Sequence, residues 1–268
     1  QGSKKGKKVV LNPLITCGEC EYCLNKIEHL CPKRVLLGMN RPIERQGCFA
    51  EMVLTPDKNI YELPNGLDIK LAPIAEPTAV SLHAVELGIS TLKKPLDQCN
   101  VLVIGGGAIG LLCALILEKV KKCKDILLSE PNTKRLQVCK NNLSSNCINP
   151  NNKEINQNSF DIIFDTVGME ATRQSAIKFV KPGGSIIHIG LTQPSGTFDF
   201  RKATLQEVTF IGTYCYTNRD FEETLNILSK GKVGDLNWIE FRELSSGAEA
   251  FKEIHNGTCS APKIILIP

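Results

Sequence analysis

The sequence predicts an α/β protein built on a doubly wound parallel sheet, preceded by a smaller β-rich unit. Two observations predict this fold class. From residue 100 onward, strands that are apolar on both faces alternate with helical patterns, which indicates a parallel sheet covered by helices on both sides. Before residue 72, short apolar runs are separated by Gly, Pro and Asn, which is typical of short strands joined by loops.

The composition is that of an ordinary globular protein and argues against several functional classes. The chain has 268 residues, enough for two domains, with 42% hydrophobic and 22% charged residues. A formal net charge of +4 predicts neither nucleic-acid binding nor strong attraction to a membrane. No apolar run has the length of a membrane span, and the basic N-terminus has no apolar signal-peptide segment behind it. Of twelve cysteines only four are clustered, so we expect reduced thiols and a cytoplasmic protein.

Residues 1–77 are expected to form the β-rich unit. The predicted strands are 7–15, 47–54 and 58–64, and a cysteine-rich loop lies between the first two. Apolar residues then recur at helical spacing from Ala72, with Gly88 placed to end the helix.

The doubly wound domain is expected to span residues 78–214. Its Asn-rich segment 141–158 is interpreted as a solvated surface excursion. The predicted strands are 100–106, 125–130, 160–168, 183–191 and 207–215, and the predicted helices between them are 108–120, 132–142 and 171–181.

The remaining segment, residues 215–268, is expected to return to the first domain. It contains two predicted helices, 220–231 and 248–257, and a closing strand at 263–268.

A glycine-rich turn follows the first strand of the doubly wound domain. In "VLVIGGGAIGLL", Gly105, Gly107 and Gly110 have G-x-G-x-x-G spacing between a buried strand and an apolar helix. Gly105 permits the tight turn, Gly107 lets the backbone approach a pyrophosphate, and Gly110 lets helix and strand pack closely. Together with Ala108 and Ile109 they predict a dinucleotide site in a Rossmann domain. The alternative is a glycine turn that binds nothing.

Glu130 ends the next strand, twenty-five residues beyond Gly105. A carboxylate there accepts both hydroxyls of an adenosine ribose and repels a 2′-phosphate, which favours NAD over NADP. Arg135 keeps NADP open, because an arginine nearby accommodates that phosphate, but we expect it to flank the adenine.

Four cysteines in "CGECEYCLNKIEHLCP" have the spacing of a metal site. Two residues separate each of the first three, and seven precede the fourth. Four thiolates suit one tetrahedral zinc and leave it no open position, so the site would be structural. An iron–sulfur cluster is disfavoured because the bacterial ferredoxin pattern has three residues before its fourth cysteine. The spacing also allows free thiols, or disulfides, which a cytoplasmic protein disfavours. The predicted zinc ligands are Cys17, Cys20, Cys23 and Cys31.

A four-cysteine loop upstream of a dinucleotide fold is an unusual pair of features. With "KKVVLNPLITCGECEYC", "GCFAEMVLTP", "AEPTAVSLHAV" and "VLVIGGGAIG", the chain resembles the zinc-dependent medium-chain dehydrogenases. The polyol (sorbitol) and L-threonine dehydrogenase branch is most similar. The segments "FDTVG", "GGSIIHIGL" and "KIILIP" extend the resemblance over essentially the whole chain.

The resemblance implies a GroES-like catalytic domain, a Rossmann NAD-binding domain and an active site in the cleft between them. Members oxidise alcohols reversibly, with a catalytic zinc as Lewis acid and NAD as hydride acceptor. The resemblance also implies a homodimer or homotetramer and a small alcohol substrate. It places six further residues along the cofactor cleft: Thr166, Val167, Gly168, Ile189, Gly190 and Leu191.

The chain departs from this family at the catalytic zinc. The family holds that zinc with a Cys and a Gly-His-Glu segment, and neither precedes Cys17 here. About 80 residues are therefore expected to be missing from the GroES-like domain, judged by the usual domain size. Glu76 matches the acidic residue that reaches the catalytic metal, and is assigned to the metal by resemblance. The alternative for Glu76 is a capping carboxylate, with Pro77 at the first helical position.

Four further polar residues are weaker candidates. His83 is expected to be a packed, hydrogen-bonded core residue, and His188 lies at best near the cofactor. Tyr214 and Tyr216 are placed to border a substrate.

The resulting hypothesis is an NAD-dependent zinc dehydrogenase for a secondary alcohol: a polyol, a sugar alcohol or a 3-hydroxy amino acid. The chain as given is expected to bind structural zinc and not to turn over alone. One alternative is a natural short form that senses NAD or assembles with a partner. Another is a zinc-free quinone oxidoreductase, which the four-cysteine loop disfavours.

Overall fold

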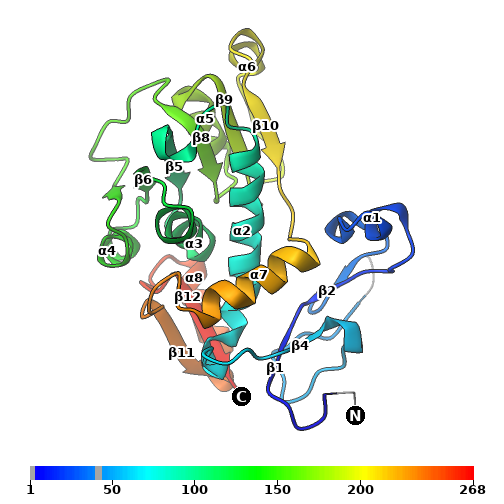
Figure 1. The fold of residues 1–268 in the computed structure, drawn as a ribbon. Coiled ribbons are helices and arrows are strands. Elements are labelled where there is room, and N and C mark those ends of the chain that lie inside the picture. Colours follow the sequence, from blue (N-terminus) through cyan, green and yellow to red (C-terminus); the bar gives the residue numbers. More distant parts are fainter. Residues whose placement is uncertain (1–3, 40–43) are drawn as a thin grey trace.

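A six-stranded parallel sheet forms the centre of the protein in the computed structural model, which describes residues 4–39 and 44–268 (Figure 1). Its strand order is β7-β6-β5-β8-β9-β10, and every neighbouring pair is parallel. This is the doubly wound order in which the first strand lies beside the point where the winding reverses. The strands are β5 (Asn100–Ile104), β6 (Asp125–Ser129), β7 (Asn146–Ile148), β8 (Phe160–Asp165), β9 (Val180–His188) and β10 (Thr209–Gly212).

Helices cover both faces of the sheet, as the alternating pattern predicts. Along β5, Val101 and Val103 face one hydrophobic core, and Leu102 and Ile104 face a second. The first core holds residues of α2, α3, α4 and α7, and the second holds residues of α5. The helices are α2 (Ala75–Ser90), α3 (Ala108–Leu115, continued by a π-helical turn Ile116–Val120), α4 (Thr133–Asn142), α5 (Glu170–Phe179), α6 (Phe200–Leu205) and α7 (Asn218–Ser229).

The prediction that Gly88 ends its helix is wrong, because α2 continues through it to Ser90. A Cβ at Gly88 would lie 2.5 Å from Ile162 Cδ1 and 2.8 Å from Phe164 Cζ, both on β8. The glycine therefore lets a buried helix pack directly against the sheet, which is a tertiary contact that helical periodicity does not report.

The Asn-rich segment is not wholly a surface excursion, because it contributes the short edge strand β7. Cys147, Ile148 and Ile155 are buried there. Residues 149–159 then cross back to β8 without an α-helix, whereas crossovers between parallel strands usually contain one. Ile155 packs into the core that α5 also covers, so this loop closes part of a sheet face otherwise left to α5.

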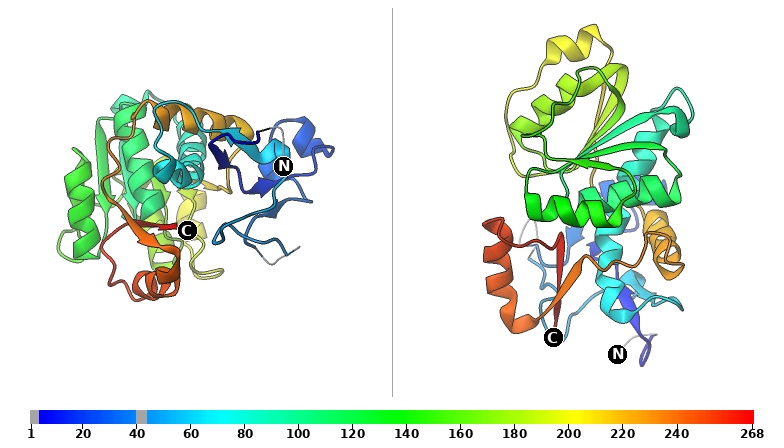
Figure 2. Two further views of the ribbon diagram at one scale, coloured as in Figure 1. Left: turned by 90° about the horizontal axis from the view of Figure 1, so that it is seen from below. Right: turned by 90° about the vertical axis from the view of Figure 1, so that its left-hand side faces the viewer.

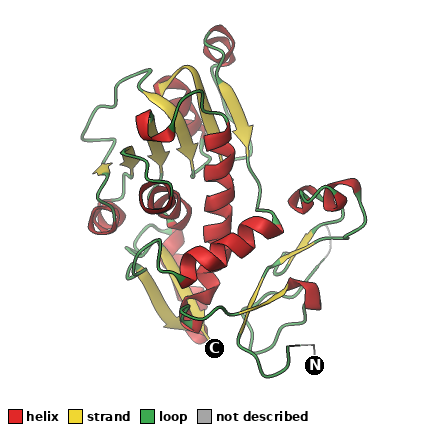
Figure 3. Ribbon diagram, viewed as in Figure 1, coloured by secondary structure: helices red, strands yellow, loops and turns green. Residues whose placement is uncertain are grey.

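The N-terminal unit is mostly loop with short strands, as Figure 3 shows. β1 pairs with β4 and β2 with β3, both antiparallel. The predicted strand at 47–54 is wrong, because that segment is irregular and pairs with no described strand, and Met52 and Leu54 are exposed. Without a partner the segment's backbone groups gain nothing from an extended ladder. The elements are β1 (Val9–Leu11), β2 (Leu14–Ile15), α1 (Glu21–Leu24), β3 (Val35–Leu36) and β4 (Ile60–Glu62).

The C-terminal segment forms a small β-α-β unit that lies at the opposite end of the molecule from α6 (Figure 2). β11 (Ile239–Glu243) and β12 (Lys263–Ile267) pair in parallel, with α8 (Gly247–His255) between them in the chain. The sequence patterns predict α8 and β12 but not β11. Among the described residues, no helix has the length and apolarity needed to cross a bilayer.

Candidate functional site

The four clustered cysteines converge on one point. Sγ–Sγ distances are 3.5 Å for Cys20–Cys23, 3.6 Å for Cys31–Cys17 and 3.9 Å for Cys17–Cys23. All four sulfurs lie within 4.8 Å of one another. Zinc–sulfur bonds of about 2.3 Å in a tetrahedron require sulfurs about 3.8 Å apart, so the four cysteines fit a closed zinc site.

Local structure brings these sulfurs together. Gly18 has φ +82°, and its N–H donates to Cys23 Sγ at 3.3 Å. A backbone hydrogen bond at Glu19 lowers the pKa of Cys17 to about 6, which favours the thiolate. Burial and the neighbouring sulfurs raise the pKa of Cys23 to about 11. A bound dication reverses that effect, because a coordinating thiol is deprotonated.

The predicted dinucleotide turn lies at the carboxyl end of β5. Gly105 has φ +103°, and Gly107 is the N-terminal cap of α3. A Cβ at Gly110 would lie 1.9 Å from the carbonyl oxygen of Gly105, so only glycine lets α3 approach the turn this closely. A Cβ at Gly107 would meet no atom within 4 Å. Gly110 thus lies on the packed side of the turn and Gly107 on its open side. Ala108 and Ile109, between these two glycines in the chain, are the first residues of α3.

Glu130 is only 3% exposed and connects the glycine turn to α4. Its carboxylate accepts from the N–H of Gly106 at 2.7 Å and from the N–H of Asn132 at 2.7 Å. Arg135 Nη2 lies 3.4 Å from the same carboxylate. Gly105, Glu130 and Arg135 share a cavity of about 600 Å³ with residues of the 149–159 crossover and of α5.

The two loops assigned to the cofactor cleft lie side by side at the same edge of the sheet. Thr192 N–H donates to the Val167 carbonyl at 3.3 Å, and Gln193 N–H donates to the Gly168 carbonyl at 3.0 Å. Thr166 Oγ1 donates to the Ile104 carbonyl at 2.8 Å, next to the glycine turn. The structure therefore brings together the segments 105–110, 166–168 and 189–191, at the carboxyl ends of β5, β8 and β9.

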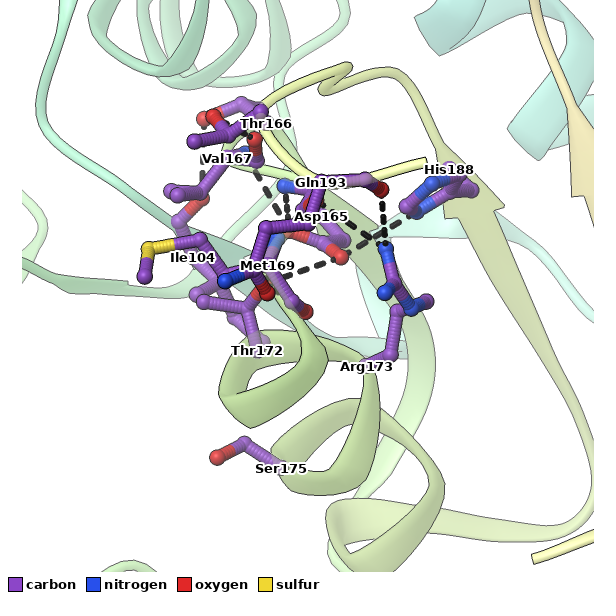
Figure 4. Close-up of polar contacts among 12 residues, drawn as sticks. Ile104, Asp165, Thr166, Val167, Met169, Thr172, Arg173, Ser175, His188 and Gln193 are labelled. Carbon is purple, nitrogen blue, oxygen red and sulfur yellow. Dashed lines mark hydrogen bonds and ion pairs between the residues drawn. The ribbon is translucent and has the colours of Figure 1, made fainter. Parts of the chain in front are cut away.

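Asp165, the last residue of β8, is absent from the residues predicted by sequence, and it lies directly beneath these loops (Figure 4). Its side chain is fully buried and accepts four hydrogen bonds, from Val167 N–H, Gly168 N–H, Thr172 Oγ1 and His188 Nδ1. Burial opposes ionisation, but these hydrogen bonds outweigh it and lower the pKa of Asp165 below its usual value. The signal that the sequence offered for Asp165 was a carboxylate directly after the mostly apolar strand "FDIIF".

Glu76 lies in the first turn of α2, but a 3₁₀ turn (Ile69–Ile74) runs directly into that helix. Pro77 is thus not the first helical residue, and Glu76 caps no free helix end. Burial raises the pKa of Glu76, with Lys263 and the Tyr216 side chain partly offsetting it. In the part of the chain that the structure describes, Glu76 belongs to no group of three or more candidate ligands. The assignment of Glu76 to the catalytic metal therefore stays a prediction.

The remaining candidates have ordinary partners. His83 is buried, and its Nδ1 lies 2.8 Å from Asp220 Oδ2. The Arg34 guanidinium stacks over the Tyr214 ring at 4.6 Å. Tyr216 is buried, and its hydroxyl donates to Asn12 Oδ1 at 3.4 Å.

Comparisons with known proteins agree with this architecture. The family model of the alcohol dehydrogenase GroES-like domain matches residues 1–65, and that of zinc-binding dehydrogenases matches residues 108–230. Among solved structures, L-idonate 5-dehydrogenase from Escherichia coli superposes with a TM-score of 0.85 at 22% identity, over 98% of this chain and 76% of that one. An alcohol dehydrogenase from Aeropyrum pernix gives a TM-score of 0.86 at 20% identity, over 100% and 78%. At these identities the superpositions show the fold.

Curated relatives include dehydrogenases and reductases. A 2-dehydro-3-deoxy-L-galactonate 5-dehydrogenase from Pseudoalteromonas atlantica is 26% identical over 87% of this chain and 67% of its own length. A probable D-xylulose reductase A from Neosartorya fischeri is 25% identical over 96% and 73%. An L-threonine 3-dehydrogenase from Enterobacter sp. is 26% identical over 80% and 62%. With the two family models, the parallel six-stranded sheet and the four-cysteine site, these matches show that the chain belongs to the zinc-dependent medium-chain dehydrogenases.

Proposed function

We propose that the chain binds NAD and serves a zinc-dependent dehydrogenase that moves hydride between a secondary alcohol and that cofactor. The observation that carries the proposal is the edge where β5, β8 and β9 end: an open glycine turn, a buried carboxylate at Glu130 and two adjoining loops. Ligands of open α/β sheets bind outside the carboxyl ends of the strands where the winding reverses, and these segments lie there. NAD supplies the hydride acceptor when it is bound.

Glu130 supports NAD over NADP. Its buried carboxylate lies beside the Gly106 N–H, where the ribose of a bound dinucleotide would lie, and it disfavours a second anion there. Arg135 is already directed at Glu130 and partly neutralises it. We expect NADH to bind at least about tenfold more tightly than NADPH. Equal or tighter binding of NADPH in a fluorescence titration would contradict this assignment.

For the substrate we propose the secondary alcohol of a polyol, a sugar alcohol or a 3-hydroxy amino acid. The support is the set of relatives, whose names include a D-xylulose reductase and an L-threonine 3-dehydrogenase. We propose residues 1–77 and 215–268 as parts of the catalytic domain and residues 78–214 as the cofactor domain.

This chain alone is proposed not to turn over. Its four-cysteine site is coordinatively closed, and Glu76 has no set of companion ligands among the residues that the structure describes. The test is an assay of the zinc-loaded chain with NAD and xylitol, sorbitol or L-threonine, together with its metal content. We expect one zinc per chain and no NADH formation. Measurable NADH formation, or a second tightly bound zinc, would refute the proposal.

The closed four-cysteine site and the lack of described companion ligands for Glu76 also favour a second candidate. This is a chain that binds NAD as a sensor, or as one part of an assembly, without catalysing a reaction. The two candidates differ in what a partner does. A partner that restores alcohol oxidation supports the dehydrogenase, and NAD-dependent association that yields no oxidation supports the sensor.

We also propose a homodimer or homotetramer. β10 is an edge strand of the sheet, and Phe210 on it is exposed beside Leu191 and Phe200, at 44%, 82% and 74%. An exposed edge with apolar side chains is a site for pairing with another chain.

We further propose that the protein is cytoplasmic. The support is that none of the twelve cysteines forms a disulfide in the structure, which is typical of a reducing environment.

A further inference from the structure

A single buried carboxylate contacts one loop of the proposed cofactor cleft and the strand end that leads into the other. Asp165 Oδ1 accepts from the N–H groups of Val167 at 3.1 Å and Gly168 at 3.0 Å. Asp165 Oδ2 accepts from Thr172 Oγ1 at 3.1 Å and from His188 Nδ1 at 3.1 Å. An ionised carboxylate offers about four acceptor positions, and all of them are used here.

These four contacts lead to three different elements. The two N–H groups belong to the loop after β8, Thr172 belongs to the first turn of α5, and His188 is the last residue of β9. The Asp165 carbonyl also accepts from the N–H groups of Ile189 at 2.9 Å and Gly190 at 3.1 Å. Asp165 therefore holds the start of loop 166–168 with its side chain and the start of loop 189–191 with both side chain and backbone.

The loops themselves are in direct contact. A Cβ at Gly190 would lie 2.0 Å from the carbonyl carbon of Val167, so only glycine lets the two backbones approach this closely. Arg173 Nη1 also donates to the carbonyls of Gly168 at 3.0 Å and Gln193 at 3.1 Å (Figure 4). Such a tight contact needs a fixed register, and Asp165 bonds to both partners: its carboxylate accepts from Val167 and Gly168, and its backbone carbonyl accepts from Gly190.

We propose that Asp165 is a positioning residue for the dinucleotide: its carboxylate fixes loop 166–168 and, through His188, the end of β9, so that both loops present one surface to the cofactor. This inference rests on the proposed NAD-binding function. When a loop populates its binding-competent arrangement only part of the time, the apparent affinity falls by that fraction. Losing the carboxylate would therefore weaken cofactor binding although Asp165 does not touch the cofactor.

Asp161 provides a matched control on the same strand. It lies near the opposite end of β8 and has three polar partners, Asn100 N–H, Lys94 and Lys181. Its side chain is 16% exposed and none of these partners belongs to the cleft loops. Asp161→Ala is expected to lower stability and to leave NADH affinity unchanged, whereas Asp165→Ala is expected to lower both.

The test is a fluorescence titration of the zinc-loaded full chain with NADH, at a temperature where each variant is folded. For Asp165→Ala we expect the Kd for NADH to rise at least about tenfold, and for Asp161→Ala to stay within about twofold. If Asp165→Ala does not fold, Asp165→Asn carries the test. Its neutral hydrogen bonds are roughly half as strong, so we expect a loss of at least about threefold.

Hydrogen exchange tests the positioning role without the cofactor. Asp165→Ala is expected to speed amide exchange in 166–168 and 189–193, and Asp161→Ala is expected to leave both segments protected. Replacing His188 by alanine should speed exchange only in the second segment.

The possible failures are distinguishable. If the unaltered chain does not bind NADH, the proposed function is wrong. If it binds NADH and folded Asp165→Ala binds within about twofold of it, or if Asp161→Ala weakens binding equally, the positioning role is overturned and the proposed function stands.

Discussion

At the scale of single residues, two aspartates near opposite ends of β8 show how differently one side chain is used. Asp165 is buried and organises loops, whereas Asp161 pairs with Lys94 and Lys181 at the sheet's other edge. The four cysteines were predictable because ligand spacing is local in sequence. The role of Asp165 was not, because His188 lies 23 residues away and meets it only once β8 and β9 pair.

The pH dependence of stability should reveal how much the ionised Asp161 carboxylate contributes to folding. Burial opposes its ionisation, but hydrogen bonds from Asn100 N–H, Lys181 and Lys94 lower its pKa in the folded state. A carboxyl with a lowered folded pKa stabilises above its unfolded pKa of about 3.9 and loses that contribution as pH falls through the folded value.

Asp161→Asn is therefore expected to lower the free energy of unfolding by about 1–2 kcal/mol at pH 7 and by less at about pH 3. Urea unfolding at both pH values measures the difference. Asp235, which is exposed, provides the control, and Asp235→Asn should have little effect at either pH. A difference in unfolding free energy between wild type and Asp161→Asn that stays constant with pH would contradict the claim that the ionised Asp161 carboxylate stabilises the fold.

At the scale of elements, segments with a strong apolar period were predictable from the sequence. Features that depend on pairing with a partner strand or on packing against another element were not. The strands of the sheet and the helices between them follow from apolar patterns. β7 and β11 are short or mixed in composition, and only their partners β6 and β12 define them. The sequence predicts a helix end at Gly88, but in the structure this glycine lies inside α2 and packs against β8.

The glycine turn gives an element-scale prediction with an internal control. Gly110→Ala places a methyl group 1.9 Å from the Gly105 carbonyl oxygen, so α3 must move away from the turn. We expect a loss of at least about 2 kcal/mol of unfolding free energy. Gly107→Ala places its methyl group in open space and should cost less than about 1 kcal/mol. Thermal and urea unfolding compare the two, and equal destabilisation would contradict the packing role of Gly110.

At the scale of the whole molecule, two units depend on different sources of stability. The sheet and its helices enclose large hydrophobic cores. The four-cysteine lobe, residues 14–36, has one four-residue α-helix, α1, a three-residue 3₁₀ turn and a two-residue strand pair, β2 with β3. Such a small unit needs a metal to fold, so zinc is expected to hold the lobe and not the sheet.

Removing zinc should therefore unfold the lobe selectively. Cys31 is fully buried, and Cys31→Ser is expected to abolish tight zinc binding and to expose residues 17–36 to proteolysis and hydrogen exchange. The six-stranded sheet should stay protected. Cys48, which is exposed and outside the cluster, supplies the control, because Cys48→Ser should keep its zinc. Loss of protection across the sheet together with the lobe would show that the two units are not independent.

Binding of a nicotinamide dinucleotide at the carboxyl edge of β5, β8 and β9 is the property on which the proposed function depends. Calorimetric titration of the zinc-loaded chain with NADH measures it. We predict one site per chain, and an affinity lowered at least about tenfold by Gly107→Ala, whose methyl group would occupy the open side of the turn that receives the pyrophosphate. No detectable binding by the folded, zinc-loaded chain, or binding that Gly107→Ala leaves unchanged, would contradict it.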